Sequence, residues 1–535
     1  DPIPHGDPSD VRDFQVCDDV SGPWVRLNID TSQVEINAKR IDMSGNLDIS
    51  GNFDVSNADS TTTFRVGGLT NAATGFALRY DIGTGLVTYS VGGLEPSGID
   101  LDCSNIVDVS TIGFCKDIFL TQPANNSIAI GHQAGGVTGV GDQGTQDIRS
   151  IAIGQLAGNS SQQTRAIAIG LEAGNSSQGQ GSVAIGSSAG SSSQGQVSVA
   201  IGEEAGGVSQ GEKSVAIGYL AGNSDQSSNC IAIGFQAGYE KQGAKAVAIG
   251  FQAGKFRQDL SAVAFGPGAG WKDQGYNAVA VGSGAGNKNQ GHSSVAVGRR
   301  AGHIDQSSNS VAIGYFAGYF RQDSSSVAIG PYAGHRDQSF NSVAIGNYAG
   351  YLDQSSNAIA IGNNAGAQSQ NNHSIAIGRL AGQSNQKRYS VAMGFGAGQT
   401  NQDTSSVAIG HEAGNLTQGA NTVAVGHDAG KIRQNDYSVA IGAFAGQTDQ
   451  SHNAVAIGAF AGQTDQSHNT VSIGFEAGNR KQGSKAVSIG YQAGKFRQDF
   501  SAVAIGPGAG WTDQSYNAVA VGSGAGNQNQ GHSSV

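Results

Sequence analysis

Glutamine is the most regularly placed polar residue that could take part in chemistry in this chain of 535 residues. From Gln162 onward, a glutamine stands at every sixteenth position as far as Gln530. Catalysis needs one constellation of groups at one place, whereas a residue repeated at this interval suits a row of amide hydrogen bonds between neighbouring repeats. We therefore predict a structural ladder that includes Gln162, Gln178, Gln194, Gln226, Gln258, Gln354 and Gln514.

The acidic, histidine and cysteine residues form no catalytic or metal-binding pattern. Carboxylates such as Glu203 and Asp225 and the 11 histidines are scattered over different positions of the repeat. A glycosidase needs two carboxylates across a cleft, and the unbroken repeat leaves no long loop to wall one. The cysteines have no CxxC pair and no metal-ligand spacing with histidine; they are Cys17, Cys103, Cys115 and Cys230. We expect no enzyme activity, cofactor or metal, and one disulfide among the first three cysteines stays open.

The repeat itself indicates the fold. From Ser150 the chain repeats a sixteen-residue unit, typified by residues 214–229, and 24 complete units precede Val535 without insertion or deletion. A short fixed period is typical of a solenoid, in which each unit stacks on its neighbours. Within a unit, Val or Ile at the second position and an apolar residue at the fourth enclose Ala or Ser at the third. This alternation is the pattern of a β-strand.

Glycines mark the corners of each unit. The fifth position is Gly in all 24 units, and Ala-Gly fills the eighth and ninth. A helix with so many glycines would lose about 1 kcal/mol for each of them, whereas turns use their positive φ. We predict turn glycines that include Gly154, Gly170, Gly218 and Gly362. At about 3.3 Å per residue, sixteen residues accommodate two strands of about five residues and two turns. The predicted fold is an all-β solenoid, a flattened parallel β-roll with two short strands per coil.

The alternation also separates the branched residues from the alanines. We interpret Val and Ile at positions two and four as the filling of the roll, with Ala at position three facing outward. An interior this thin gains little from burial compared with the cost of ordering the chain. A flat face of small apolar residues would then favour a close partner, so we expect oligomerisation along the alanine face.

The segments SVAIGEEAG at 198–206 and SVAIGHEAG at 406–414 resemble the head repeats of trimeric autotransporter adhesins of the YadA-like type. The resemblance covers about residues 127–535. It implies a left-handed parallel β-roll, three chains packed side by side, and a head that projects from a surface to bind host matrix or cells. This chain differs from the family in its uniform unit with an added glutamine, and such units are also similar to those of fibre proteins of large viruses.

The residues before the array follow another pattern. Three hexads within 41–57 carry apolar residues at their first and third places, as in the shafts of viral and phage tail fibres, which they resemble. Alternation on both sides of Gly-Thr-Gly predicts a β-hairpin over 78–89. We expect a β-rich cap, adaptor or shaft region at 1–126, an atypical first coil with seven extra residues at 127–149, and the β-roll array at 150–535.

The net charge and the surface residues limit the kinds of partner that the chain can bind. A net charge of −11 without a basic stripe argues against nucleic acid, and there is no apolar run of about eighteen residues to span a membrane. Aromatic residues at variable positions either contact a receptor or another fibre or shield the turns; they include Phe256, Trp271, Tyr319, Phe320 and Trp511. We predict a non-enzymatic homotrimeric subunit of an extracellular fibre on a cell or virion surface. The alternative is an adhesin head that binds a host receptor, matrix or glycan.

Overall fold

The computed structural model describes residues 127–136 and 146–535, together with nine short strands before them. These strands are β1 (Asp13–Cys17), β2 (Val25–Asn28), β3 (Asn46–Asp48), β4 (Thr63–Phe64), β5 (Phe76–Asp81), β6 (Leu86–Val91), β7 (Ile99–Asp100), β8 (Ile112–Gly113) and β9 (Phe119–Thr121). The chain forms two compact units, Asp1–Ile169 and Gly170–Val535.

The first unit begins with two small sheets, one with the strand order β2-β1-β3 and the other β4-β5-β6-β7. Strands β5 and β6 pair antiparallel, with Leu78 opposite Tyr89, so the predicted hairpin is confirmed. Of the hexad segment at 41–57, only β3 is among the described residues. Cys103 and Cys115 lie outside them, and the question of a disulfide therefore stays a prediction.

The same unit contains the first coils of the array. Strand β10 (Ile128–Ile130) pairs antiparallel with β9 and parallel with β11 (Ile151–Ile153), which in turn pairs with β13 (Ile167–Ile169). A short 3-10 turn, η1 (Ala134–Gly136), follows β10, and β12 (Ser160–Gln162) belongs to the opposite wall. The loop expected in the atypical first coil falls largely on residues 137–145, outside the described part of the chain.

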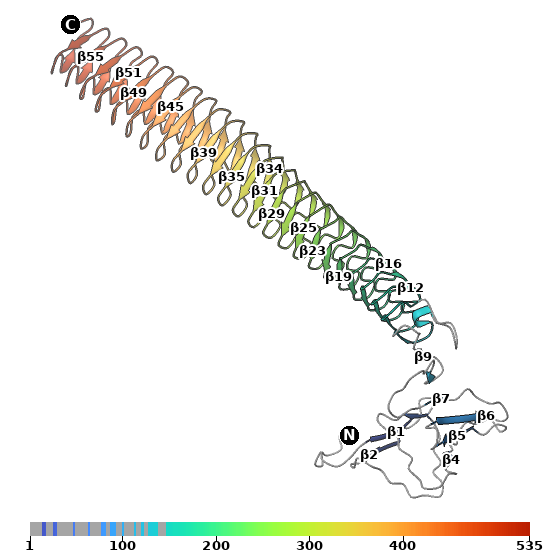
Figure 1. Cartoon of the computed structure of the whole chain (residues 1–535). Coiled ribbons are helices and arrows are strands. Elements are labelled where there is room, and N and C mark those ends of the chain that lie inside the picture. Colours follow the sequence, from blue (N-terminus) through green and yellow to red (C-terminus); the bar gives the residue numbers. More distant parts are fainter. Residues whose placement is uncertain are drawn as a thin grey trace. The chain divides into compact units, whose positions relative to one another are not determined.

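The second unit is a parallel β-solenoid with two three-residue strands in every sixteen-residue coil, as predicted for the fold class (Figure 1). One sheet consists of the odd-numbered strands from β15 (Val183–Ile185) to β57 (Val519–Val521), each sixteen residues after the last. The other consists of the even-numbered strands from β14 (Ser176–Gln178) to β58 (Gln528–Gln530) at the same interval. We call them the alanine sheet and the glutamine sheet after their buried residues.

The strands are shorter than the predicted five residues because the backbone turns into the left-handed region at several positions in each coil. Besides the glycines, the residues at positions seven, twelve and sixteen have positive φ, as in Asn364 (55°), Asp353 (54°) and Asn357 (58°). Positions seven and sixteen lie in the turns, whereas position twelve is the middle residue of each glutamine-sheet strand, as Asp353 is in β36 (Leu352–Gln354). These conformations limit the number of consecutive extended residues. Asn and Asp, which tolerate positive φ best among residues other than glycine, recur at positions twelve and sixteen, but the three positions also accept many other residue types.

Hydrogen bonds between backbones run mainly from coil to coil. Val199 N donates to Ser214 O at 2.8 Å, and Gly206 N donates to Ala221 O at 2.9 Å, each in the following coil. Strands pair in register, so that Val199 faces Val215 and Ala200 faces Ala216. Each coil is therefore held by its two neighbours, as in other solenoids.

The interior contains alanine and glutamine, and the predicted orientation of the strands was wrong. Alanines at positions three and eight, such as Ala360 and Ala365, are fully buried, and they form one continuous cluster from Ala237 to Ala461. The glutamines at position thirteen lie opposite them and are equally buried as far as Gln514, while Gln530 in the last coil is partly exposed. Val and Ile at positions two and four face outward, and Ile409 is 38% exposed.

The narrow gap between the sheets explains this orientation. A Cβ atom built on Gly366, at the ninth position, would lie 2.5 Å from Gln370 Oε1 and 3.2 Å from Ala360 Cβ. Only a methyl group and a flat amide fit between walls this close, and a branched side chain would need space that a packed interior does not provide. Alanine is therefore inside because it is small.

Candidate functional surfaces

The buried glutamines form a hydrogen-bonded ladder along the axis. Gln338 Nε2 donates to Gln354 Oε1 at 3.1 Å, and Gln354 Nε2 donates to Gln370 Oε1 at 3.0 Å. Gln354 Nε2 also donates to Val343 O at 2.9 Å, across the coil in the alanine sheet. The amide suits this place because it carries a donor and an acceptor without a charge. The ladder thus joins successive coils and ties the two sheets together.

All seven glutamines named from the sequence are buried, and further donor bonds continue the pattern. Acceptor oxygens in the next coil lie 3.2 Å from Gln194, 2.9 Å from Gln226, 2.8 Å from Gln258 and 2.9 Å from Gln514. Gln162 donates to Ile151 O at 2.8 Å, and Gln178 lies in β14.

The ladder contains one further glutamine that was not predicted from the sequence. Gln146, in the atypical first coil, donates to Gln162 Oε1 at 2.8 Å and to Ile128 O at 3.0 Å. Counted from Ser127, Gln146 does not fall at position thirteen, because that coil has seven extra residues. Counting back from the next coil would have found it, because Gln146 precedes Ser150 by the same four residues that separate Gln162 from Ala166.

The fifth-position glycines stand where the backbones of successive coils approach. Their φ angles are 127° at Gly154, 131° at Gly170, 123° at Gly218 and 128° at Gly362. A Cβ atom on Gly362 would lie 2.7 Å from the carbonyl carbon and oxygen of Gly378. Close approach along the axis, together with the positive φ, explains the glycine.

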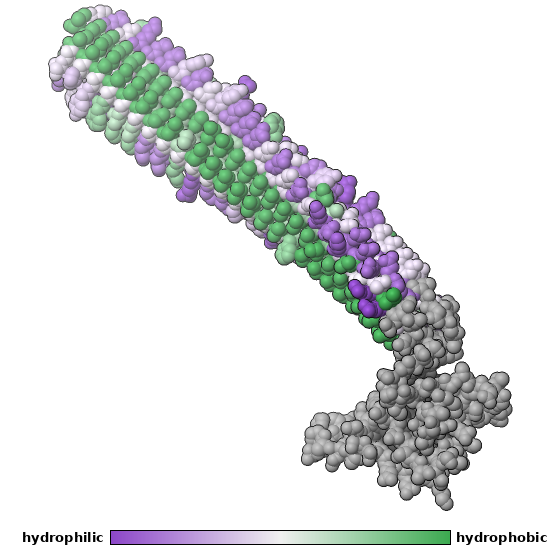
Figure 2. Space-filling model, viewed as in Figure 1, coloured by the Kyte–Doolittle hydropathy of each residue, from purple (hydrophilic) through white to green (hydrophobic). Residues whose placement is uncertain are grey.

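The outward residues at positions two and four of the alanine sheet make a continuous apolar band, which we call the Val/Ile stripe. Figure 2 shows it as a green band along the second unit. Exposed members include Ile313 (38%), Met393 (39%) and Ile441 (38%). Soluble single-chain proteins rarely expose an apolar patch larger than a few hundred Å², so a surface of this length indicates an interaction site.

A family model of the YadA head domain repeat matches residues 355–381, in two copies. The match spans β37 (Ile359–Ile361), β38 (Gln368–Gln370) and β39 (Ile375–Ile377), together with the turns that connect them. These coils are YadA-like head repeats. The resemblance to YadA-like head repeats is confirmed for these coils, whereas the similarity to fibre proteins of large viruses stays a prediction. Head repeats of this kind suggest an adhesin-like surface protein with a β-roll. No curated protein and no solved structure matches the chain.

The glutamine sheet presents polar and charged side chains on its outer face. Arginine and aspartate pair between neighbouring coils at the twelfth position, with Arg257 Nε 3.0 Å from Asp273 Oδ1 and Arg321 Nε 2.6 Å from Asp337 Oδ1. Such exposed pairs contribute little to stability. They make this face unlike the Val/Ile stripe. In the described part of the chain, no helix is long and apolar enough to cross a membrane.

The aromatic residues named from the sequence lie at or next to the starts of glutamine-sheet strands, with Phe256 in β24 (Phe256–Gln258) and Phe320 in β32 (Phe320–Gln322). Phe256 packs edge-on against Trp271, with ring centroids 5.2 Å apart, and Phe496 packs against Trp511 in the same way at 5.4 Å. Tyr319 stacks between His303 and His335, each at 5.1 Å. The Arg321 guanidinium lies 5.0 Å from the Phe320 ring centre. All five named aromatics are partly buried, so each combines contact within the stack with a surface open to a partner.

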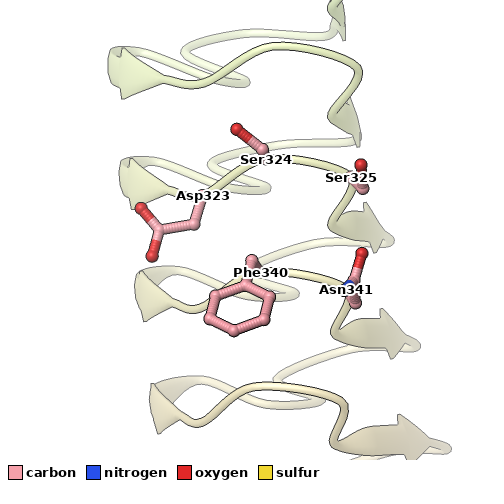
Figure 3. Close-up of a pocket in the computed structure, with 5 residues that line it drawn as sticks. All are labelled: Asp323, Ser324, Ser325, Phe340 and Asn341. Atoms are coloured by element: carbon pink, nitrogen blue, oxygen red, sulfur yellow. The ribbon is translucent and has the colours of Figure 1, made fainter.

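A surface hollow is lined by outer-turn residues of two successive coils (Figure 3). Asp323, Ser324 and Ser325 come from one coil, and Phe340 and Asn341 come from the next. Asp323 is the one carboxylate among these lining residues, so the hollow lacks the pair of acids that glycoside hydrolysis requires.

Proposed function

We propose that this protein is a non-enzymatic structural subunit of an extracellular fibre, on a cell or virion surface, and that it assembles as a homotrimer of parallel β-rolls. The Val/Ile stripe carries this proposal, because it is continuous, outward and confined to one sheet. The similarity to YadA head repeats supports three copies side by side.

The composition of the interior gives the physical reason for association. Each coil buries small alanines and a glutamine, while its largest aliphatic side chains stay at the surface. Burial of apolar surface contributes about 25 cal/mol per Å², so a coil that hides only methyl groups gains little of it. Packing of stripes from several copies supplies the missing burial. The charged outer face of the glutamine sheet then remains in water.

The experiment is a measurement of particle mass by analytical ultracentrifugation or native mass spectrometry. Four stripe residues, Ile313, Ile409, Ile441 and Ile505, are changed together to aspartate. The control changes four outward apolar residues of the glutamine sheet, Ile304, Leu352, Leu416 and Ile432, to aspartate. We expect three times the chain mass for the unmodified protein and the control, and smaller particles for the stripe variant. A single-chain mass for the unmodified protein would refute the proposal.

A second candidate function is an adhesin head that binds a host receptor. The recurrence of residues 246–295 as 486–535 favours it, because Trp271 and Trp511 occupy equivalent places in the two copies. Arrays of glycans and matrix proteins test this candidate with the double variant Trp271→Ala and Trp511→Ala. Saturable binding that disappears in the variant supports an adhesin, whereas no binding by the assembled protein supports a scaffold alone.

A further inference from the structure

Two imidazoles and a carboxylate meet on the outer turns of two successive coils. His411, His427 and Asp428 each offer one ligand atom, and these atoms lie within 4.8 Å of one another. They form the one such group of three that the described residues contain. Spacing rules for metal motifs miss it, because His411 and His427 are sixteen residues apart and meet only when coils stack.

The carboxylate of Asp428 is buried, and only one of its two oxygens accepts hydrogen bonds. The Asp428 side chain is 9% exposed. Its Oδ2 atom accepts hydrogen bonds from Lys431 Nζ at 3.2 Å and from Gln447 Nε2 at 3.3 Å. Its Oδ1 atom is also buried and has no hydrogen-bond partner. A buried carboxylate oxygen without a partner is costly, so this atom favours a donor or a cation.

Both imidazoles direct a nitrogen toward that oxygen. His427 Nδ1 lies 3.7 Å and His411 Nδ1 lies 4.0 Å from Asp428 Oδ1, which is too long for a hydrogen bond. The two rings stack with centroids 4.7 Å apart and planes 3° from parallel. Ligand atoms around a tetrahedral zinc ion are separated by roughly 3.3 Å, given bond lengths of about 2.0–2.1 Å. Modest rotations of two half-exposed rings would bring the three atoms to that separation.

We propose that His411 Nδ1, His427 Nδ1 and Asp428 Oδ1 bind a divalent transition-metal ion of the zinc type, with water completing its coordination. Two nitrogens and one oxygen suit such an ion, whereas Ca²⁺ and Mg²⁺ prefer oxygen ligands alone. Lys431 also pairs with Glu412, so the two carboxylates outweigh its single positive charge. Lys431 and Gln447 fix the orientation of Asp428 as outer partners of the site.

The chain contains a matched control for stacked histidines. His452 and His468 also stack in successive coils, with centroids 5.5 Å apart and planes 7° from parallel. The carboxylate beside them, Asp436, is 44% exposed and lies 3.9 Å from His452. This pair has the two rings without the buried oxygen, and we expect no tight binding there.

The test is isothermal titration of the full chain with ZnCl₂, after removal of metal by a chelator and without a polyhistidine tag. His427→Phe and Asp428→Ala remove ligands, and His452→Phe with His468→Phe is the control. Phenylalanine should preserve the ring stack, because Phe395 and Phe444 already neighbour the two histidines in it. Circular dichroism of each variant checks that the fold is intact.

We expect about one zinc ion per chain, at least tenfold weaker binding in His427→Phe and Asp428→Ala, and unchanged binding in the control. Absence of zinc binding by the unmodified chain would overturn the proposal. So would binding that survives both ligand variants, or that falls equally in the control, because either result would indicate adventitious histidine binding.

Discussion

The two sheets of each coil contrast in what they place inside and outside. The alanine sheet buries methyl groups and exposes Val and Ile, whereas the glutamine sheet buries an amide and exposes charged residues such as Arg321 and Asp337. In neither sheet is the most hydrophobic side chain the buried one. Size and satisfied hydrogen bonds decide burial in this narrow roll, and hydrophobicity decides which outer face is available for association.

The strongest test of this contrast is Gly362→Val at the corner after the alanine sheet. The new side chain would meet the Gly378 backbone in the next coil, and the φ of 128° disfavours any L side chain. We expect the free energy of local opening to fall by about 4 kcal/mol or more. Amide hydrogen exchange of residues 343–378 measures it, because a long repeat array does not unfold as one unit. Asn363→Val, at a variable outward position, is the control.

A second test exchanges polar and apolar residues within one strand, β36 (Leu352–Gln354). Gln354→Leu removes the donor to Val343 O and to Gln370 Oε1, and it also removes the acceptor of Gln338 Nε2. We expect a loss of about 3 kcal/mol in the same exchange measurement. The reciprocal change Leu352→Gln faces outward and should have almost no effect. Equal effects of the two changes would contradict the ladder.

A third test adds volume to the alanine sheet. Ala360→Val inserts two methyl groups into the gap between the sheets, and we expect a loss of about 2 kcal/mol from overpacking. Ile359→Val, in the same strand and facing outward, should change local exchange very little. If Ala360→Val proved neutral, the gap would be wider than the packing of Ala360 against Gly366 and Gln370 indicates.

The smallest expected effect concerns pH and a single outer contact. Lys495 Nζ, 2.7 Å away, and then Gln492 donate hydrogen bonds to Glu476 and hold the pKa of this carboxyl below its ordinary value. A lowered folded-state pKa gives stability that is present above the ordinary pKa of glutamate and is lost as pH falls through the folded value. Glu476→Gln should therefore be slightly less stable than the unmodified chain at pH 7, and this difference should shrink as the pH falls from 7 to 3. Amide hydrogen exchange of the coils that contain Glu476 and Lys495 measures the difference at both pH values, and an equal difference at both would contradict the assignment.

Much of the fold follows from the sequence because the repeat is so regular. The period predicts the length of one coil, and the alternation around Ala360 predicts a strand. The recurrence of Gln354 and its counterparts predicts a ladder of hydrogen-bonded glutamines. The reason for glycine at the ninth position is harder to predict from the sequence. Gly366 and Asn364 share nearly the same φ, 51° and 55°, so conformation alone does not require glycine at 366. The nearby Gln370 side chain excludes a Cβ there, and that contact is known only from the folded coil.

The sequence by itself determined the sixteen-residue period, one strand of each coil, the corner glycines and the regular recurrence of the glutamines. Only the tertiary structure decided which side of the alanine sheet faces inward, because a period of two separates Ala from Val and Ile without saying which set is buried. The same holds for His411, His427 and Asp428, which are brought together by stacking of coils. The distance between the two sheets and the axial rise are properties of the folded coil. Because the gap between the sheets is narrow, only the small side chain fits inside, and the branched side chains lie at the surface.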